Sequence, residues 1–148
     1  SDAIHVLAYI EMFQDTRSLS SEMIASSIET NAANVRKIMS QLKKSGLIFT
    51  KTGKPQPSLA KSPDQISLLD VYRSIEGNTQ LIQVDPKTNP NCVVGANIQE
   101  ALEESYARLQ KKAEEEMAKI TLDSLIHKIA VLEKEKRPEN TGLVERFL

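Results

Sequence analysis

The sequence predicts a mainly α-helical chain with one small two-stranded sheet and one long helix. Three observations support this fold class. Apolar residues recur at spacings of three and four over most of the 148 residues. A β-branched and aromatic run, LIFTK at 47–51, is followed by a turn-forming segment. An apolar stripe at coiled-coil spacing then runs from Ile98 to Ile120.

Composition excludes several classes of protein. The chain has 40% hydrophobic and 26% charged residues, enough for a folded core. It contains no run of about 18 apolar residues and no signal-peptide pattern, so we expect a cytosolic protein without a membrane span. Cys92 is the single cysteine, which excludes an internal disulfide framework and a zinc or iron–sulfur site built from several thiolates.

The first sixty residues predict three short helices and a hairpin. A helix over 3–13 is followed by a second that begins after Ser20 or Ser21, and by a third that begins after Thr30 or Asn31. The third helix has its apolar residues at i, i+3, i+4 and i+7, namely Val35, Ile38, Met39 and Leu42. Strands over 47–51 and 58–60 flank a turn. This order predicts a winged helix-turn-helix, in which the third helix enters the DNA major groove.

The rest of the chain divides into four parts at its turn-rich segments. A helix capped by Ser67 completes a winged domain over 1–77, and a loop over 78–94 is the expected hinge or sensor. Residues 95–136 predict dimerisation helices, and 137–148 a flexible tail. The stripe expected at the dimer interface consists of Ile98, Leu102, Tyr106, Leu109, Ala113, Met117 and Ile120. One such stripe needs a partner helix to cover it.

Charge is sorted along the chain although the net charge is only −1. Between positions 30 and 61 there are seven basic residues and no acidic one: Arg36, Lys37, Lys43, Lys44, Lys51, Lys54 and Lys61. Such a block is the footprint of a face that binds a polyanion, since neutralised phosphates release counterions. A solvated helix face is the alternative that charge alone leaves open.

Several segments together resemble the Rrf2 family of bacterial winged-helix regulators, which includes the IscR, NsrR and CymR types. They are LKKSGL at 42–47, the Gly53 turn and, most specifically, QISLLDVYRSIEG at 65–77. The segment CVVGANIQEAL at 92–102 is similar to the YwnA-like branch, whose members have a lone cysteine before the dimerisation helix. The resemblance implies a homodimeric, cytoplasmic, DNA-binding regulator of transcription.

The resemblance also indicates which residues contact DNA. The family's base-contacting positions correspond here to Ala33, Arg36, Ser40 and Thr52, of which Arg36 can bind guanine through its guanidinium fork. Asn31 and Asn34 either read adenine or cap the third helix, and for Asn31 we favour capping. Four lysines are expected to contact phosphates: Lys37, Lys43, Lys51 and Lys54.

Cluster-binding members of the family have three closely spaced cysteines before the long helix, so we expect no cluster and no other cofactor here. Cys92 lies near the predicted start of that helix, where the helix dipole can lower the pKa of a thiol. It is therefore either a redox-sensing thiol or a small buried apolar residue.

We expect a dimeric regulator, a repressor, that binds double-stranded DNA at a palindromic operator and responds to thiol oxidation or to a small molecule. The alternative is a protein-interaction adaptor or anti-adaptor that keeps the dimer fold without binding DNA. The replacement of the family's glycine-rich wing by Lys54, Pro55, Gln56 and Pro57 favours this alternative, and the basic block argues against it. An enzyme is not expected, because no phosphate-binding glycine loop, catalytic pair or metal-ligand cluster is present in the sequence.

Overall fold

The computed structural model describes residues 1–15, 19–50, 56–75 and 80–148. Its helices are α1 (Asp2–Phe13), α2 (Ser21–Ile28), α3 (Ala32–Lys44), α4 (Leu68–Ser74), α5 (Val93–Met117), α6 (Leu122–Lys136) and α7 (Thr141–Val144). Its strands are β1 (Ile48–Thr50) and β2 (Pro57–Leu59), and its 3-10 helices are η1 (Pro63–Gln65), η2 (Pro138–Asn140) and η3 (Glu145–Phe147). Among the described residues, no helix is long and apolar enough to cross a membrane.

Helices α1, α2 and α3 pack together because each turns an apolar face inward. Ile24 of α2 and Val35 and Leu42 of α3 are fully buried against α1. The Ser20 side chain accepts a hydrogen bond from the Met23 backbone N–H and so starts α2, which satisfies one of the free donors of the first turn.

Helix α3 ends at a glycine that leads into the sheet. Gly46 has a φ of +73°, a left-handed conformation that favours glycine and stops the helix. Strand β1 then pairs antiparallel with β2, with Ile48 opposite Leu59. The chain is therefore mainly helical with a small two-stranded sheet, and the predicted winged helix-turn-helix is confirmed.

Helix α6 belongs to the same core as α1, which differs from its predicted place beside the long helix. The backbone turns back at the end of α5, where Leu122 donates to the carbonyl of Ile66. That turn directs the apolar stripe of α6 onto α1, and Leu122, Ile126 and Ala130 are buried there. The predicted unit over 95–136 is thus split between an extended helix and the winged core.

Residues 137–148 are helical, which corrects the expectation of a flexible tail. The segment comprises η2, α7 and η3, and Val144 is buried in the core. Arg146 anchors it to α1, since its Nη1 lies 3.1 Å from Asp15 Oδ2 and its Nη2 donates to the carbonyl of Glu11. The expectation failed because the polar composition of this segment does not reveal that its few apolar residues pack against α1 and α6.

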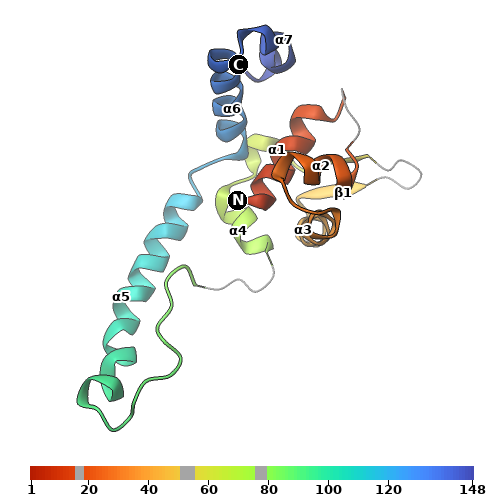
Figure 1. The fold of residues 1–148 in the computed structure, drawn as a ribbon. Coiled ribbons are helices and arrows are strands. Elements are labelled where there is room, and N and C mark those ends of the chain that lie inside the picture. The colour runs from red at the N-terminus through yellow and green to blue at the C-terminus, as the bar shows by residue number, and fades with distance from the viewer. Residues whose placement is uncertain (16–18, 51–55, 76–79) are drawn as a thin grey trace.

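Helix α5 extends away from this core, and the segment over 80–92 returns beside it (Figure 1). That segment has no helix or strand. Among the described residues of α5, only Gln110 is buried. The long helix therefore contributes little to the core of its own chain.

Candidate nucleic-acid interface

The exposed face of α3 holds most of the predicted DNA-contacting side chains. The predicted residues Ala33, Arg36, Lys37, Ser40 and Lys43 are all exposed. They follow one another at spacings of one and three, and so they share the side of the helix opposite its buried apolar residues. The folded chain thus presents a basic helical surface free of acidic side chains within α3.

Asn31 is the N-cap of α3. Its Oδ1 accepts a hydrogen bond of 2.8 Å from the Asn34 backbone N–H. The side chain of Asn34 in turn donates to the hydroxyl of Thr30 at 3.2 Å. Both asparagines hold the start of α3, as we favoured for Asn31, and the helix N-terminus they complete lies at the same end as Ala33.

Arg36 has an acidic neighbour that sequence reasoning missed. Its Nη1 lies 3.8 Å from Oε1 of Glu22 on α2, and both side chains are largely exposed, at 60% and 73%. An exposed ion pair of this length is weak, so Arg36 remains available to another acceptor. This contact between Glu22 and Arg36 could have been predicted from the helix-turn-helix geometry, which places the first turn of α2 beside the middle of α3.

Two elements of the predicted interface are joined by Lys43. Its Nζ donates to the hydroxyl of Thr50 at 3.1 Å, which connects the end of α3 to β1. The predicted contacts Lys51, Thr52 and Lys54 lie outside the described residues.

Cys92 is the N-cap residue of α5, and its side chain is exposed. The predicted alternative of a buried apolar residue is therefore wrong for the single chain, because nothing in the described part of the fold covers this helix end. Backbone N–H groups of Gly95 and Val94 lower the pKa of the Cys92 thiol below its usual range. The turn before it is tightly packed, since a Cβ at Gly95 would clash with the backbone oxygen of Asn89.

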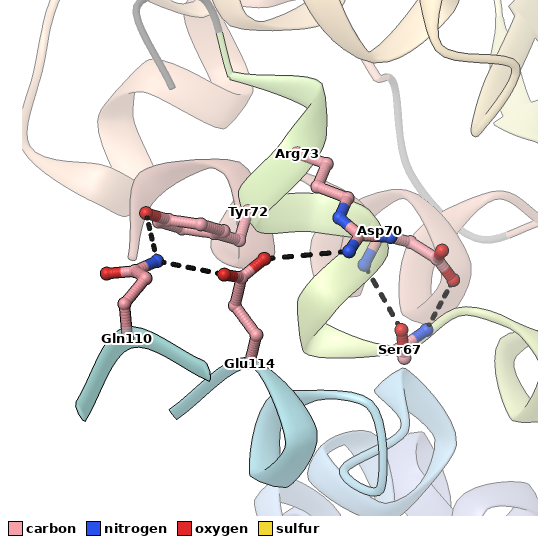
Figure 2. Close-up of polar contacts among 6 residues, drawn as sticks. All are labelled: Ser67, Asp70, Tyr72, Arg73, Gln110 and Glu114. Atoms are coloured by element: carbon pink, nitrogen blue, oxygen red, sulfur yellow. Dashed lines mark hydrogen bonds and ion pairs between the residues drawn. The ribbon is translucent and has the colours of Figure 1, made fainter. Parts of the chain in front are cut away.

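A polar network joins the winged core to the long helix (Figure 2). Gln110 of α5 donates to the hydroxyl of Tyr72 at 3.1 Å and to Glu114 at 3.2 Å. Glu114 pairs with Arg73 at 3.5 Å, and the Gln110 oxygen accepts from the backbone N–H of Leu81 at 2.9 Å. One buried amide therefore ties together α4, α5 and the segment that precedes α5.

Helix α4, which supplies Tyr72 and Arg73, is itself fixed at its start. Ser67 Oγ accepts from the Asp70 N–H, and the Asp70 carboxylate accepts from the Ser67 N–H, a reciprocal capping box (Figure 2). The sequence predicted the Ser67 cap but not the network, because Gln110 lies between stripe residues and reads as an ordinary polar position.

The predicted dimer stripe lies along α5, except for Ile120, which follows the helix, and within the described part of the chain α4 contacts α5. Leu109 is 51% exposed, and the other six residues, Ile98, Leu102, Tyr106, Ala113, Met117 and Ile120, are partly exposed. Val93 and Val94 at the start of the helix add exposed apolar surface. Contiguous apolar surface of this kind on a helix indicates a missing partner.

Comparison with known proteins gives a family match over most of the chain. The model of the Rrf2 family, described as an iron-dependent transcriptional regulator, matches residues 1–128. The donor set does not fit bound iron, because the chain has a single thiol and its described residues contain no group of three His, Cys, Asp or Glu side chains that could hold a metal ion.

Individual relatives agree with the family match. YwnA of Bacillus subtilis, described as a candidate HTH-type transcriptional regulator, is 41% identical over 125 residues, covering 84% of this chain and 92% of YwnA. A crystal structure of a candidate DNA-binding protein is 38% identical with a TM-score of 0.65, covering 84% of this chain and 95% of that one. The structure of CymR, the global cysteine regulator of B. subtilis, shares the fold, with a TM-score of 0.59 and 20% identity over 83% of this chain and 88% of its own. The chain belongs to the Rrf2 family of transcriptional regulators.

Proposed function

We propose that the chain is a homodimeric, sequence-specific repressor that binds a palindromic DNA operator in the cytoplasm. The observation that supports this most directly is the exposed basic face of α3, with Arg36, Lys37 and Lys43 on one side of a helix that follows a short turn. Such a helix fits the major groove, where an arginine fork can discriminate guanine by about 1–3 kcal/mol. Repression follows from occupancy of a promoter and needs no further surface.

The apolar stripe of α5 supports the homodimer. Two copies of this helix would cover the surface around Leu109 that one chain leaves exposed. Two-fold symmetry would then place one α3 in each of two major grooves, about one or two helical turns apart.

Cys92 is the proposed site of thiol regulation. Its exposed thiol has a lowered pKa and lies where the loop meets α5, between the two functional parts. Attack of its thiolate on hydrogen peroxide would break the O–O bond, form a sulfenic acid at Cys92 and release hydroxide, which takes up a proton to give water. A charged or larger group at this helix start would alter the turn that Gly95 holds so closely against Asn89.

The test is a selection of bound duplexes from random DNA at about 0.1 M salt. Reduced wild type should enrich a palindrome, and peroxide should abolish this enrichment in wild type but not in Cys92→Ser. Enrichment that survives oxidation in both proteins would exclude the thiol switch. Failure to enrich any sequence would favour the adaptor alternative.

Two substitutions separate base reading from phosphate binding. Arg36→Ala should change the preferred base at one position of each half-site, with a loss of about 5–100-fold. Lys37→Ala should weaken binding to all sequences alike and reduce the salt dependence. Lys128→Ala is the matched control, since Lys128 is an exposed residue of α6 and the substitution removes the same charge at a position away from α3.

A further inference from the structure

A cavity of about 430 Å³ lies between α1, the end of α6 and the C-terminal helical segment. Its floor is apolar and comes from α1, where the rings of Tyr9 and Phe13 lie 4.8 Å apart at an angle of 54°. Ile129 and Leu143 line the opposite wall, and they are 43% and 51% exposed. The size and the apolar walls are those of a site for a small ligand.

The polar residues that line this cavity include Glu133, Arg137 and Asn140. Glu133 is occupied within the chain, since one oxygen accepts from Arg137 at 2.7 Å and the other from Asn140 at 2.6 Å. Arg137 uses one of its five N–H donors there, and its side chain remains 64% exposed. An incoming molecule thus meets a guanidinium whose neighbouring carboxylate is already satisfied.

The ligand class follows from these two halves. Aromatic rings and branched aliphatic side chains favour a flat apolar body, and the guanidinium favours an oxygen acceptor with negative charge. We propose that this cavity binds an aromatic monocarboxylate and is the effector site of the regulator.

Part of the cavity is built from residues outside the match to the family model. The family model ends at residue 128, so Arg137, Asn140 and Leu143, which close the cavity, lie beyond the matched region. These residues are placed by the helical segment that Arg146 anchors to α1.

The cavity also reaches the helix that precedes α3. Its rim includes His5 of α1 and Ser27 of α2, whose Nε2 and Oγ atoms are 2.8 Å apart. Ser27 lies in the last turn of α2, four residues before the Asn31 cap of α3. A ligand at this rim is therefore positioned to shift α3, the helix proposed to contact DNA, relative to the core. This consequence rests on the proposed function, whereas ligand binding itself does not.

Calorimetry and NMR on the full chain test the binding. Phenylacetate and indole-3-acetate are expected to bind with a dissociation constant of the order of 0.1 mM. The neutral 2-phenylethanol should bind about tenfold more weakly, and the cationic 2-phenylethylamine more weakly still. Resonances of Tyr9 and Ile129 should shift on addition of either acid.

Arg137→Gln should weaken binding of both acids about tenfold and leave the alcohol unaffected. Lys134→Gln is the control, because it removes the same charge from an exposed position of α6 that does not line the cavity. The site is excluded if neither acid binds at about 10 mM, if both variants behave alike, or if shifts are confined to α5. It is also excluded if the Tyr9 and Ile129 resonances show that the partner subunit fills the cavity in the dimer.

The effector role has its own readout. Saturating phenylacetate should change operator affinity at least about threefold in wild type and leave Arg137→Gln unchanged at the same concentration. Acid binding with unaltered operator affinity would remove the effector role. A protein that binds the acid but no DNA, with or without ligand, would contradict the proposed function and leave the binding site established.

Discussion

The winged core and the long helix α5 solve the problem of apolar surface in opposite ways. In the core, side chains such as Leu7, Ile24 and Leu42 are fully buried by neighbours from the same chain. In α5, which has 25 residues, the only buried residue among those described is the polar Gln110. The core can be stable within one chain, whereas α5 presents its apolar stripe for another.

This difference also separates the proposed activities. The face of α3 that we propose binds DNA is supported from behind, since the opposite side of the helix is part of the core. The distance between two such surfaces in a dimer depends on α5 and on how α5 is fixed to α4. In the proposed dimer, operator spacing would therefore depend on the contact between α4 and α5.

The largest expected effect comes from truncating a matched pair of leucines. Leu42→Ala removes a side chain with 0% exposure from the core and should lower the free energy of unfolding by about 2–5 kcal/mol. Leu109→Ala should change the stability of the monomer by less than about 0.5 kcal/mol, because half of that side chain is already exposed. Denaturant unfolding of the monomer at low concentration measures both.

Leu109→Glu tests whether the exposed stripe of α5 forms the dimer interface. We expect the dimer dissociation constant to rise about 100-fold, since a charge enters an apolar helix interface twice. Arg108→Glu, on the neighbouring exposed position, is the control and should leave the dimer intact in sedimentation velocity. Equal dissociation of both variants would place the interface elsewhere.

The next effect concerns the junction between the two regions. Gln110→Ala removes the acceptor of the Leu81 N–H and the hydrogen bond that Gln110 donates to the Tyr72 hydroxyl, and it should cost about 1–3 kcal/mol. Gln99→Ala, a truncation of the same residue type on the same helix, removes an exposed bond to Asp85 and should cost less than about 0.5 kcal/mol. Hydrogen exchange at Leu81 distinguishes local loosening of the junction from global unfolding.

A smaller effect tests the support of α3. Asn31→Ala removes the cap and should cost about 0.5–2 kcal/mol, whereas Asn31→Ser keeps a hydroxyl acceptor and most of the stability. The two variants also separate capping from base reading. A Ser variant that is stable but loses an adenine preference would show that Asn31 contacts DNA.

The sequence was sufficient where local rules determine structure. The caps at Ser20, Asn31 and Ser67 agree with the structure, because each depends on residues within one turn. The helical periodicity of the sequence likewise placed the recognition-helix residues on the exposed side of α3.

The failures are tertiary. The amphipathic stripe of α6 indicated that the helix packs against another element but did not identify that element. In the structure the element is α1. The helical end of the chain and the Gln110 network depend on groups more than 25 residues apart in sequence, such as Arg146 with Asp15 and Gln110 with Leu81. No short-range pattern encodes such contacts.

Glu22 offers a small effect that sharpens the role of the core surface. Glu22→Gln removes the acidic neighbour of Arg36 and should raise affinity for non-specific duplex about two- to fivefold, since a carboxylate near phosphates is repulsive. Operator affinity should rise less, so the ratio of specific to non-specific binding falls. Glu29→Gln, which lies after α2, removes the same charge as a control, and equal effects would mean that only net charge matters.

The smallest effect belongs to the start of α5 and follows from the pKa of Cys92. Because neighbouring backbone N–H groups lower this pKa in the folded chain, the native thiol loses its proton at a lower pH than the unfolded chain does. The rate of alkylation by iodoacetamide, which reports the thiolate, should therefore rise with pH earlier in native protein than in protein unfolded by urea. An identical pH profile in both states would show that the helix start does not activate the thiol.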